Sequence, residues 1–279
     1  MLDNLMEPTT WRLIKTPPAV GAWNMAVDEM LLEKVAKPGV LPVLRLYAWD
    51  PPCLSLGYAQ AMTDIDFGRL MRHGWGLVRR PTGGRAILHT DELTYSVIAP
   101  QEEPRVAGGV LESYRRLSAA LLDTLKILGA NANAEKTYDS EEQNQPMNPV
   151  CFEVPSNYEI TVDGKKLIGS AQSRRFQAVL QHGALPLVGD LCRITDALRY
   201  PDDADRAEAA AKLVAHAATL ELVLHKQVSW DEAADAMQNA FARTLNITFH
   251  EVPLDDNEIA RADALIHEKY ANPAWTNRS

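Results

Sequence analysis

Two features of the sequence contain residues that could carry out chemistry. The first is a cysteine that precedes two lysines. Cys151 belongs to no periodic apolar segment, follows a polar stretch and precedes a hairpin that carries Lys165 and Lys166. A thiol in such a setting can be exposed and have a depressed pKa, which would make it a nucleophile. Judged by residue type alone, Cys151 is better explained as a structural residue, since most free cysteines are inert.

The second feature is a basic loop at residues 79–89 with the sequence Arg-Arg-Pro-Thr-Gly-Gly-Arg-Ala-Ile-Leu-His. Glycines at 83 and 84 allow successive backbone N–H groups to converge on an anion or an oxyanion, and the guanidinium groups beside them are permanently charged donors. The pattern predicts a loop that binds a phosphate, a carboxylate or an acyl carbonyl. The Gly-Gly pair taken alone is equally compatible with an ordinary turn between solvated arginines.

Composition limits the class of protein. The chain has 279 residues, 46% of them hydrophobic, which is ample for a buried core in one large domain. It contains no apolar run of about 18 residues and no secretory signal, so we expect a cytoplasmic protein without a membrane partner. The net charge of −9 argues against a nucleic-acid partner. Basic pairs such as Arg174-Arg175 suit an acidic docking partner, although most such pairs are only solvated surface.

The three cysteines, Cys53, Cys151 and Cys192, are widely spaced and include no Cys-x-x-Cys pair. Neither a disulfide framework nor a zinc site is therefore expected. Cys53 lies in a predicted strand, where a cysteine usually packs as a small apolar residue.

Periodicity and turn residues predict the elements that must position these groups. We expect strands at 11–14, 43–47, 53–58, 74–79, 158–162, 165–170 and 178–187. We expect helices at 24–35, 110–128, 205–216, 229–245 and 256–270, with weaker helical character at 64–73. Asn24 is the expected N-cap of the first helix, and Ser229 with Glu232 forms a capping box. Residues 86–97 alternate as a half-buried hairpin or a bent strand, and 135–148 form a long surface loop.

A hairpin is predicted around Asp163-Gly164, a dipeptide typical of two-residue turns. The turn fixes three cross-strand pairs, namely Val162 with Lys165, Thr161 with Lys166, and Ile160 with Leu167. Lys166 then points to the face opposite the apolar residues, and Lys165 is the more exposed of the two lysines.

Several of these segments together resemble one superfamily. The loop at 79–89, followed by Glu-Leu-Thr-Tyr-Ser at 92–96, resembles the signature of lipoate-protein ligases and octanoyltransferases, and within them the LipM-type octanoyltransferases. Asn-Met-Ala-Val-Asp-Glu at 24–29 matches the superfamily's first helix. Cys151-Phe152 matches the motif in which LipM-type enzymes carry their nucleophile, whereas LipB-type transferases take their cysteine from a different loop. Lys166 matches the lysine that the superfamily places on this hairpin.

The resemblance implies a fold and a reaction. The expected fold is α+β, with a mixed, largely antiparallel β-sheet core flanked by helices, as in biotin/lipoate-protein ligase-like catalytic domains. Residues 1–279 would form one such domain, with a helical C-terminal segment at 205–279. The expected reaction is octanoyl transfer from octanoyl-acyl carrier protein, through a cysteine thioester, to a lysine of a lipoyl domain, with glycine cleavage H protein as the implied acceptor.

The resemblance also implies the site residues, while neither a cofactor nor a metal is expected. Cys151 and Lys166 would be catalytic. The lysine would hold the acyl carbonyl, stabilise a neighbouring thiolate and shuttle a proton. The expected substrate-binding residues are Arg79, Arg80, Thr82, Gly83, Gly84, Arg85, His89, Gly169, His182 and Gly183. The two histidines lie in strand-like segments, so hydrogen-bonded supporting roles are favoured for them over catalytic ones.

Three alternatives stay open. An ATP-dependent lipoate-protein ligase of the same fold would typically have a third glycine where Arg85 stands and an Asp-x-Gly-Asn turn at 90–93, and both departures favour the transferase. An amidotransferase that moves octanoyl between lipoyl domains would also use a cysteine. A catalytically idle protein that binds lipoyl domains or acyl chains would have an unreactive Cys151.

Overall fold

The computed structural model describes residues 6–135 and 159–278. Two β-sheets organise them, and the larger sheet has the strand order β11-β1-β2-β6-β10-β9-β8-β7. Its strands are β1 (Thr9–Lys15), β2 (Val43–Tyr47), β6 (Glu92–Pro100), β7 (Asn133–Glu135), β8 (Glu159–Val162), β9 (Lys165–Arg175), β10 (Ala178–Pro186) and β11 (Ile247–Glu251). β1 pairs in parallel with both β11 and β2, and the other pairings in this order are antiparallel. The predicted mixed, largely antiparallel core is thus confirmed.

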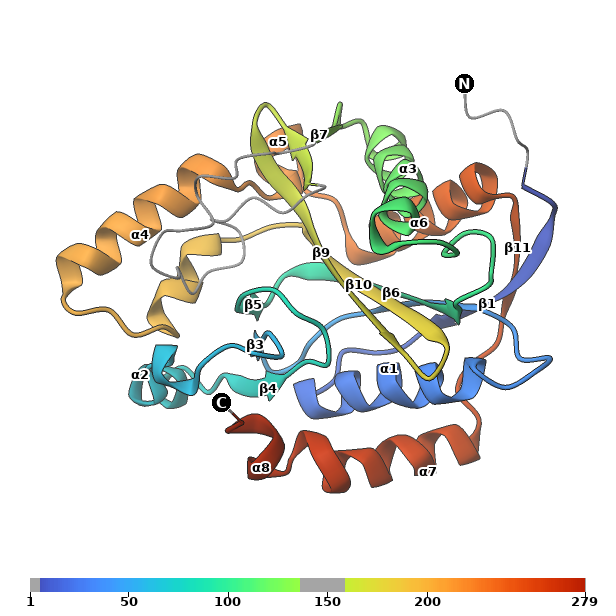
Figure 1. The fold of residues 1–279 in the computed structure, drawn as a ribbon. Helices are drawn as coiled ribbons and strands as arrows, with labels where there is room; N and C mark the ends of the chain where they lie inside the picture. The colour runs from blue at the N-terminus through green and yellow to red at the C-terminus, as the bar shows by residue number, and fades with distance from the viewer. Residues whose placement is uncertain (1–5, 136–158, 279) are drawn as a thin grey trace.

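Helices cover both faces of the large sheet (Figure 1). On one face, α3 (Val110–Leu128) and α6 (Trp230–Leu245) pack their apolar sides on residues such as Tyr95 and Val97. On the other face lies α1 (Gly21–Val35), and α7 (Asp256–Leu265) packs on its far side. Among the described helices, none is both long and apolar enough to cross a membrane.

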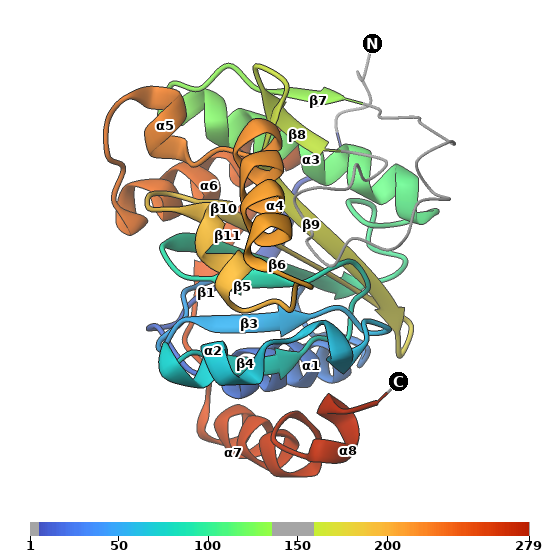
Figure 2. The same cartoon turned by 90° about the vertical axis from the view of Figure 1, so that its left-hand side faces the viewer.

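The smaller sheet contains β4 (Gly76–Arg79), β3 (Cys53–Leu56) and β5 (Ile87–His89), in that order. Figure 2 shows it above α1, with α4 (Asp203–His216) on its other side. The apolar residues between this sheet and α4 form a separate core with α2 (Phe67–Arg72) and the 3₁₀ segment η3 (Leu191–Asp196). The remaining short elements are η1 (Met62–Asp64), α5 (Leu220–Leu224), η4 (Ile266–Tyr270) and α8 (Pro273–Thr276).

Most predicted elements are present within one to three residues of their expected bounds, and the capping box of Ser229 with Glu232 is confirmed. The chain at 86–97 does not form a hairpin: β5 belongs to the small sheet and β6 to the large one, so the chain bends from one sheet into the other. The prediction of a helical segment at 205–279 was incomplete, because β11 lies within it at the edge of the large sheet. Within the loop predicted at 135–148, Glu135 ends β7, and 136–148 lie outside the described residues.

Asn24 does not cap the first helix. The helix begins at Gly21 instead, where a Cβ atom would lie 2.5 Å from the Cys53 sulfur. Asn24 is therefore inside the first turn, fully buried, and its amide donates to the carbonyl oxygens of Ala19 and Ala48. This close packing between the helix and the small sheet accounts for a helix that starts earlier than predicted.

The hairpin at Asp163-Gly164 has the predicted register in its first two pairs, Val162 with Lys165 and Thr161 with Lys166. The third pair was wrong, because Ile160 pairs with Ile168 and not with Leu167. One extra residue is thus inserted into β9 directly after Lys166, which is the geometry of a β-bulge. Bulges bend a strand and redirect its side chains, and this one adjoins the lysine expected to be catalytic.

The C-terminal helix α7 is tied to the sheet by one carboxylate. Glu258 accepts hydrogen bonds from Arg12 at 2.6 and 2.8 Å and from Lys34 at 2.6 Å. Burial by itself raises the pKa of Glu258, but these hydrogen bonds outweigh burial and bring the pKa to about 2, from a usual 4.5. A pKa that is depressed by folding stabilises the folded state above pH 4.5, and this contribution is lost as the pH falls toward 2.

We therefore expect Glu258→Gln to be less stable than the wild type at pH 7, with the difference shrinking steadily between pH 4.5 and pH 2. Urea denaturation at several pH values measures the difference between the two proteins. Glu208→Gln is the control, because Glu208 pairs with Lys212 on the exposed face of α4. A pH-independent difference for Glu258→Gln would contradict the assigned ion pair.

Candidate active site

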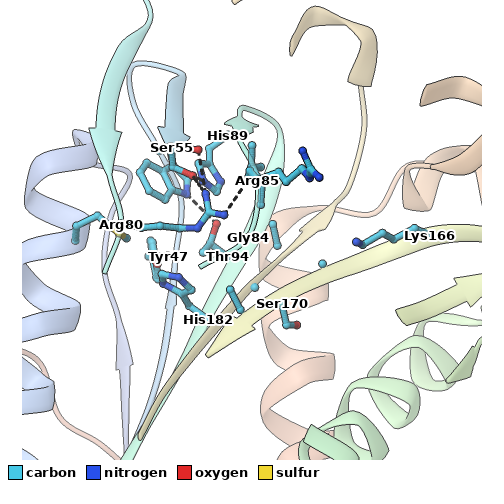
Figure 3. A pocket seen from close by; sticks show the side chains of 17 residues that line it. Tyr47, Ser55, Arg80, Gly84, Arg85, His89, Thr94, Lys166, Ser170 and His182 are labelled. Atoms are coloured by element: carbon cyan, nitrogen blue, oxygen red, sulfur yellow. Dashed lines mark hydrogen bonds between the residues drawn. The ribbon is translucent and has the colours of Figure 1, made fainter. Parts of the chain in front are cut away.

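A cavity of about 200 Å³ lies between the α1 face of the large sheet and the small sheet. It is lined by Met25, Tyr47, Trp49, Ser55, Arg80, Gly84, Arg85, Ile87, His89, Thr94, Lys166, Gly169, Ser170, Ala171, His182, Gly183 and Ala184. Figure 3 shows Arg80, Ser55 and His89 together at one side of the cavity, while Arg85 and Lys166 extend into its other side. The lining thus combines apolar walls with a few convergent polar groups, as ligand pockets usually do.

The guanidinium of Arg80 holds the Gly-Gly loop in shape. It donates to the carbonyl oxygens of Gly83 at 2.9 Å and Arg85 at 2.6 Å, and to both oxygens of Ser55 at 3.0 and 3.1 Å. Arg80 is buried, with 3% of its surface exposed. Its guanidinium therefore holds the loop through hydrogen bonds, and the carbonyl oxygens of Gly83 and Arg85 point toward Arg80.

The backbone N–H groups of Gly83 and Gly84 donate to no acceptor among the described residues. Gly84 has φ +88°, a left-handed conformation that favours glycine. A Cβ atom on the neighbouring Gly57 would lie only 1.8 Å from the Gly84 carbonyl oxygen. Two backbone segments therefore cross in direct contact here, and the loop presents exposed N–H donors beside the cavity.

A chain of hydrogen bonds supports Arg80 from the large sheet. Ser55 contacts the Nε2 atom of His89 at 2.8 Å, and the Nδ1 atom of His89 contacts Glu92 at 2.6 Å. With Nδ1–H donating to the Glu92 carboxylate, Nε2 accepts the Ser55 proton, and the Ser55 oxygen accepts from Arg80. The His89 ring stacks on Trp49 at 3.9 Å between centroids. This chain links β6, β5 and β3 to the loop.

A second network lies beneath the cavity and is built on a buried ion pair. Asp28 of α1 and Arg45 of β2 are 2.7 Å apart, and neither side chain is exposed to solvent. Asp28 also accepts from Tyr47 at 3.1 Å and Ser96 at 2.8 Å. Burial raises the pKa of Asp28, but the charge of Arg45 and the hydrogen bonds of its neighbours outweigh burial and lower it.

His182 connects this network to the loop. Its Nδ1 atom lies 3.3 Å from the Asp28 carboxylate and its Nε2 atom 2.7 Å from the Thr82 hydroxyl. Burial lowers the pKa of His182 although Asp28 opposes the shift, so the ring is neutral near pH 7. Nδ1–H then donates to Asp28, and Nε2 accepts from Thr82. Both histidines thus hold the loop through hydrogen bonds, as the sequence predicted.

Gly183 allows β9 and β10 to approach closely at the cavity wall. A Cβ atom there would lie 2.6 Å from the Gly169 carbonyl oxygen and 2.7 Å from both Ser170 and Tyr95. Any side chain would force the strands apart. A glycine is therefore needed at position 183, and Gly169 contributes the neighbouring backbone of the cavity wall.

Lys166 enters the cavity from β9 and is buried, with 3% of its surface exposed. Its ammonium donates to Glu159 of β8 at 2.7 Å. Lys165, expected to be exposed, is half-buried, and its ammonium donates to the Val214 carbonyl oxygen at 2.8 Å. The two neighbouring lysines thus point in different directions, and Lys166 is the one in the cavity.

With this geometry established, comparison with known proteins identifies the family. Residues 21–242 match the model of the lipoyl protein ligase A/B catalytic domain. The chain belongs to this family. It is 40% identical over 272 residues to the octanoyltransferase LipM of Kyrpidia tusciae, covering 96% of this chain and 99% of that one. It is 37% identical over 276 residues to the octanoyltransferase LipM of Bacillus subtilis, covering 97% and 99% of the two chains.

Solved structures agree on the fold. The bipartite lipoate protein ligase of Thermoplasma acidophilum, studied with its E2 lipoyl domain, superposes with a TM-score of 0.81 at 26% identity and 96% coverage of both chains. A lipoate-protein ligase A bound with ATP gives a TM-score of 0.78 at 26% identity, covering 96% of this chain and 99% of that one. The predicted superfamily, its α+β fold and the resemblance to LipM-type octanoyltransferases are confirmed.

Within this family fold, most residues predicted for the site come together. Arg80, Gly84, Arg85, His89, Lys166, Gly169, His182 and Gly183 all line the cavity. Thr82 supports it through His182, and Gly83 lines a second hollow that shares Gly84 and Arg85 with the cavity. Arg79 differs from the prediction, because it is fully buried and donates to the carbonyl oxygens of Gly57, Tyr58, Gln60 and Thr276. Its guanidinium joins the segment 57–60 to α8 and does not line the cavity.

The two cysteines among the described residues lie outside the lining of the cavity. Cys53 is buried at the small sheet, and burial raises the pKa of its thiol to about 12, so it is no nucleophile near pH 7. Cys192 is half-buried on η3, and neither it nor Cys53 lines the cavity. Cys151, predicted to be the nucleophile of this transferase type, lies outside the described residues.

Sequence reasoning missed several polar residues of the site. Ser55 and Thr94 lie in strands where a hydroxyl has no distinctive spacing, and Asp28 was not among the predicted site residues. The Asn-Met-Ala-Val-Asp-Glu segment contained a signal for Asp28, because an acidic residue on the apolar side of a helix needs a buried partner. Arg45, alternating with Leu44 and Leu46 in a predicted strand, was the matching signal.

We expect Asp28→Asn to cost about 3–5 kcal/mol of stability, because it leaves the buried Arg45 guanidinium without its counter-charge. Urea unfolding followed by circular dichroism measures the loss. Asp235→Asn is the matched control, since Asp235 pairs with Lys15 at the surface, 67% exposed, and should change stability little. Equal stability losses for the two variants would refute the central role of the Asp28–Arg45 pair.

Proposed function

We propose that this chain is an acyltransferase that moves an octanoyl group from octanoyl-acyl carrier protein to a lysine of a lipoyl domain, with glycine cleavage H protein as the acceptor. The observation that carries the proposal is similarity to octanoyltransferases LipM at 35–40% identity over nearly the full chain. The lipoyl-domain acceptor is also supported by the archaeal relative, which was studied with an E2 lipoyl domain.

The first half of the reaction acylates the enzyme. The Cys151 thiolate attacks the carbonyl carbon of the octanoyl thioester, forming a new C–S bond and a tetrahedral oxyanion. The free N–H groups of the Gly-Gly loop and the Lys166 ammonium are the donors available to that oxyanion, and one such donor contributes roughly 3 kcal/mol in other enzymes. Collapse of the oxyanion breaks the bond to the carrier sulfur, which leaves as a thiolate and takes up a proton.

The second half of the reaction removes the octanoyl group from the enzyme. The neutral ε-amine of the acceptor lysine attacks the Cys151 thioester, expels the thiolate and loses a proton, which leaves an amide. One thioester replaces another in the first step, and an amide replaces a thioester in the second, so the sequence needs no ATP. The enzyme alternates between two stable forms, and ping-pong kinetics follow.

We expect incubation with octanoyl-acyl carrier protein, without ATP, to add one octanoyl group to the enzyme in intact-mass spectra. Hydroxylamine should remove the added mass, and H protein should accept it. Cys151→Ala should show no adduct, while Cys192→Ser, which changes a half-buried thiol outside the cavity, should be acylated normally. Acceptor modification that requires ATP and free octanoate would instead establish a ligase.

We expect Lys166→Met to slow formation of the octanoyl-enzyme roughly 100- to 1,000-fold, because it removes a cation from the oxyanion's surroundings. Stopped reactions analysed by mass spectrometry give the rate at saturating donor. Lys165→Met is the matched control, since that neighbouring lysine points to Val214. Thermal melts of both variants separate a lost catalytic contribution from a lost Lys166–Glu159 ion pair, and equal acylation rates for both would refute the role of Lys166.

A further inference from the structure

A second hollow adjoins the cavity on the other side of the Gly-Gly loop. We call it the outer pocket; it has a volume of about 490 Å³ and shares Gly84 and Arg85 with the lining of the cavity. Its lining consists of Tyr58, Ala59, Gln60, Ala61, Asp64, Pro81, Gly83, Gly84, Arg85, Gln172, Ser173 and Arg175. A ligand that extends past Gly84 and Arg85 would pass from one hollow into the other.

Two arginines line the outer pocket and a third lies beside it. Arg85 and Arg175 line it, and Arg278 lies beside it, donating to the Tyr58 hydroxyl at 2.6 Å. None of the three forms an ion pair with a carboxylate in the described parts of the chain, and Asp64, the carboxylate in the lining, accepts instead from Gln60 at 3.4 Å. On a protein with a net charge of −9, such a concentration of unneutralised cations indicates an anion site.

Aromatic rings hold two of these three guanidinium groups in place. The guanidinium carbon of Arg278 lies 3.9 Å from the centroid of Tyr58, and that of Arg175 lies 5.1 Å from it. Arg278 also lies 4.8 Å from the Trp275 ring, whose indole N–H donates to the Arg79 carbonyl oxygen. Tyr58 is fixed by a backbone hydrogen bond to Thr82. Arg175 and Arg278 are thus positioned on a tyrosine that is itself hydrogen-bonded to the loop bordering the cavity.

We propose that the outer pocket binds the phosphate of the phosphopantetheine arm that delivers the octanoyl group. This inference rests on the proposed function. An octanoyl chain in the cavity is attached through its thioester to an arm that ends in a phosphate ester. Because Gly84 and Arg85 line both hollows, an arm that passes these two residues reaches the outer pocket. Its single anionic group then meets Arg175 and Arg278, since guanidinium groups bind phosphate oxygens in pairs.

The test compares donors that differ only in the phosphate, namely octanoyl-4′-phosphopantetheine and octanoyl-pantetheine. Arg175→Met and Arg278→Met each remove a charge but keep an apolar side chain on Tyr58. We expect each to raise the donor KM for acyl-enzyme formation about tenfold with the phosphorylated donor, with no change in kcat. With octanoyl-pantetheine the KM should equal that of the wild type. Arg72→Met, on the exposed face of α2, is the control for loss of one positive charge and should change neither donor's KM.

Equal effects on both donors would show that the arginines position the acyl group, and no effect on either would show that the phosphate binds elsewhere; both overturn the proposal. A KM increase for ATP, in a reaction that depends on ATP, would assign the pocket to a nucleotide phosphate and also overturn it. Failure of the wild type to form a thioester adduct with any donor would instead refute the proposed transferase.

Discussion

The buried ion pair between Asp28 and Arg45 is the interaction on which the site depends. Two charges removed from water are costly unless further hydrogen bonds satisfy them. Here Asp28 accepts from Tyr47, Ser96 and His182 as well, and Arg45 donates to the side chain and carbonyl oxygen of Asn24. These partners come from α1, β2, β6 and β10. The pair can therefore form only when helix and sheet have docked in one orientation, and it fixes the floor of the cavity as it forms.

The Gly-Gly loop also depends on surrounding hydrogen bonds, because it carries its donors on a segment without regular secondary structure. Such a loop is mobile unless its backbone is held from several sides. Asp28 holds it through His182 and Thr82, while Glu92 holds it through His89, Ser55 and Arg80. Both chains end on backbone or hydroxyl groups between residues 80 and 85. The backbone of the loop beside the cavity is thus held in one conformation, and preorganised donors are what stabilises a developing oxyanion.

Sequence patterns predicted the elements and the loop because both depend on local spacing. Tyr95 and Val97 alternate in β6, and Asp163-Gly164 sets a hairpin, so these features could be derived from neighbouring residues. The family signature added the identity of Lys166. Three things could not be derived. The bulge after Lys166 depends on packing across β8, β11 pairs with a strand more than 200 residues away, and Ser55 acquires its partners only when the two sheets meet. These features arise from tertiary contacts, which override local pattern.

The arginines of this region fall into two groups. One group is buried in the protein, and the charges of the other are available to a ligand. Arg45, Arg79 and Arg80 are buried and each donates to several backbone or side-chain oxygens, so their charges build the scaffold. Arg85, Arg175 and Arg278 form no ion pair with a carboxylate among the described residues, and the Tyr58 ring orients Arg175 and Arg278 without neutralising them. Neighbouring positive charges repel one another. Burial together with the charge of Arg278 lowers the pKa of Arg79. An anionic ligand relieves that repulsion, so the scaffold itself favours a negatively charged group at the mouth of the cavity.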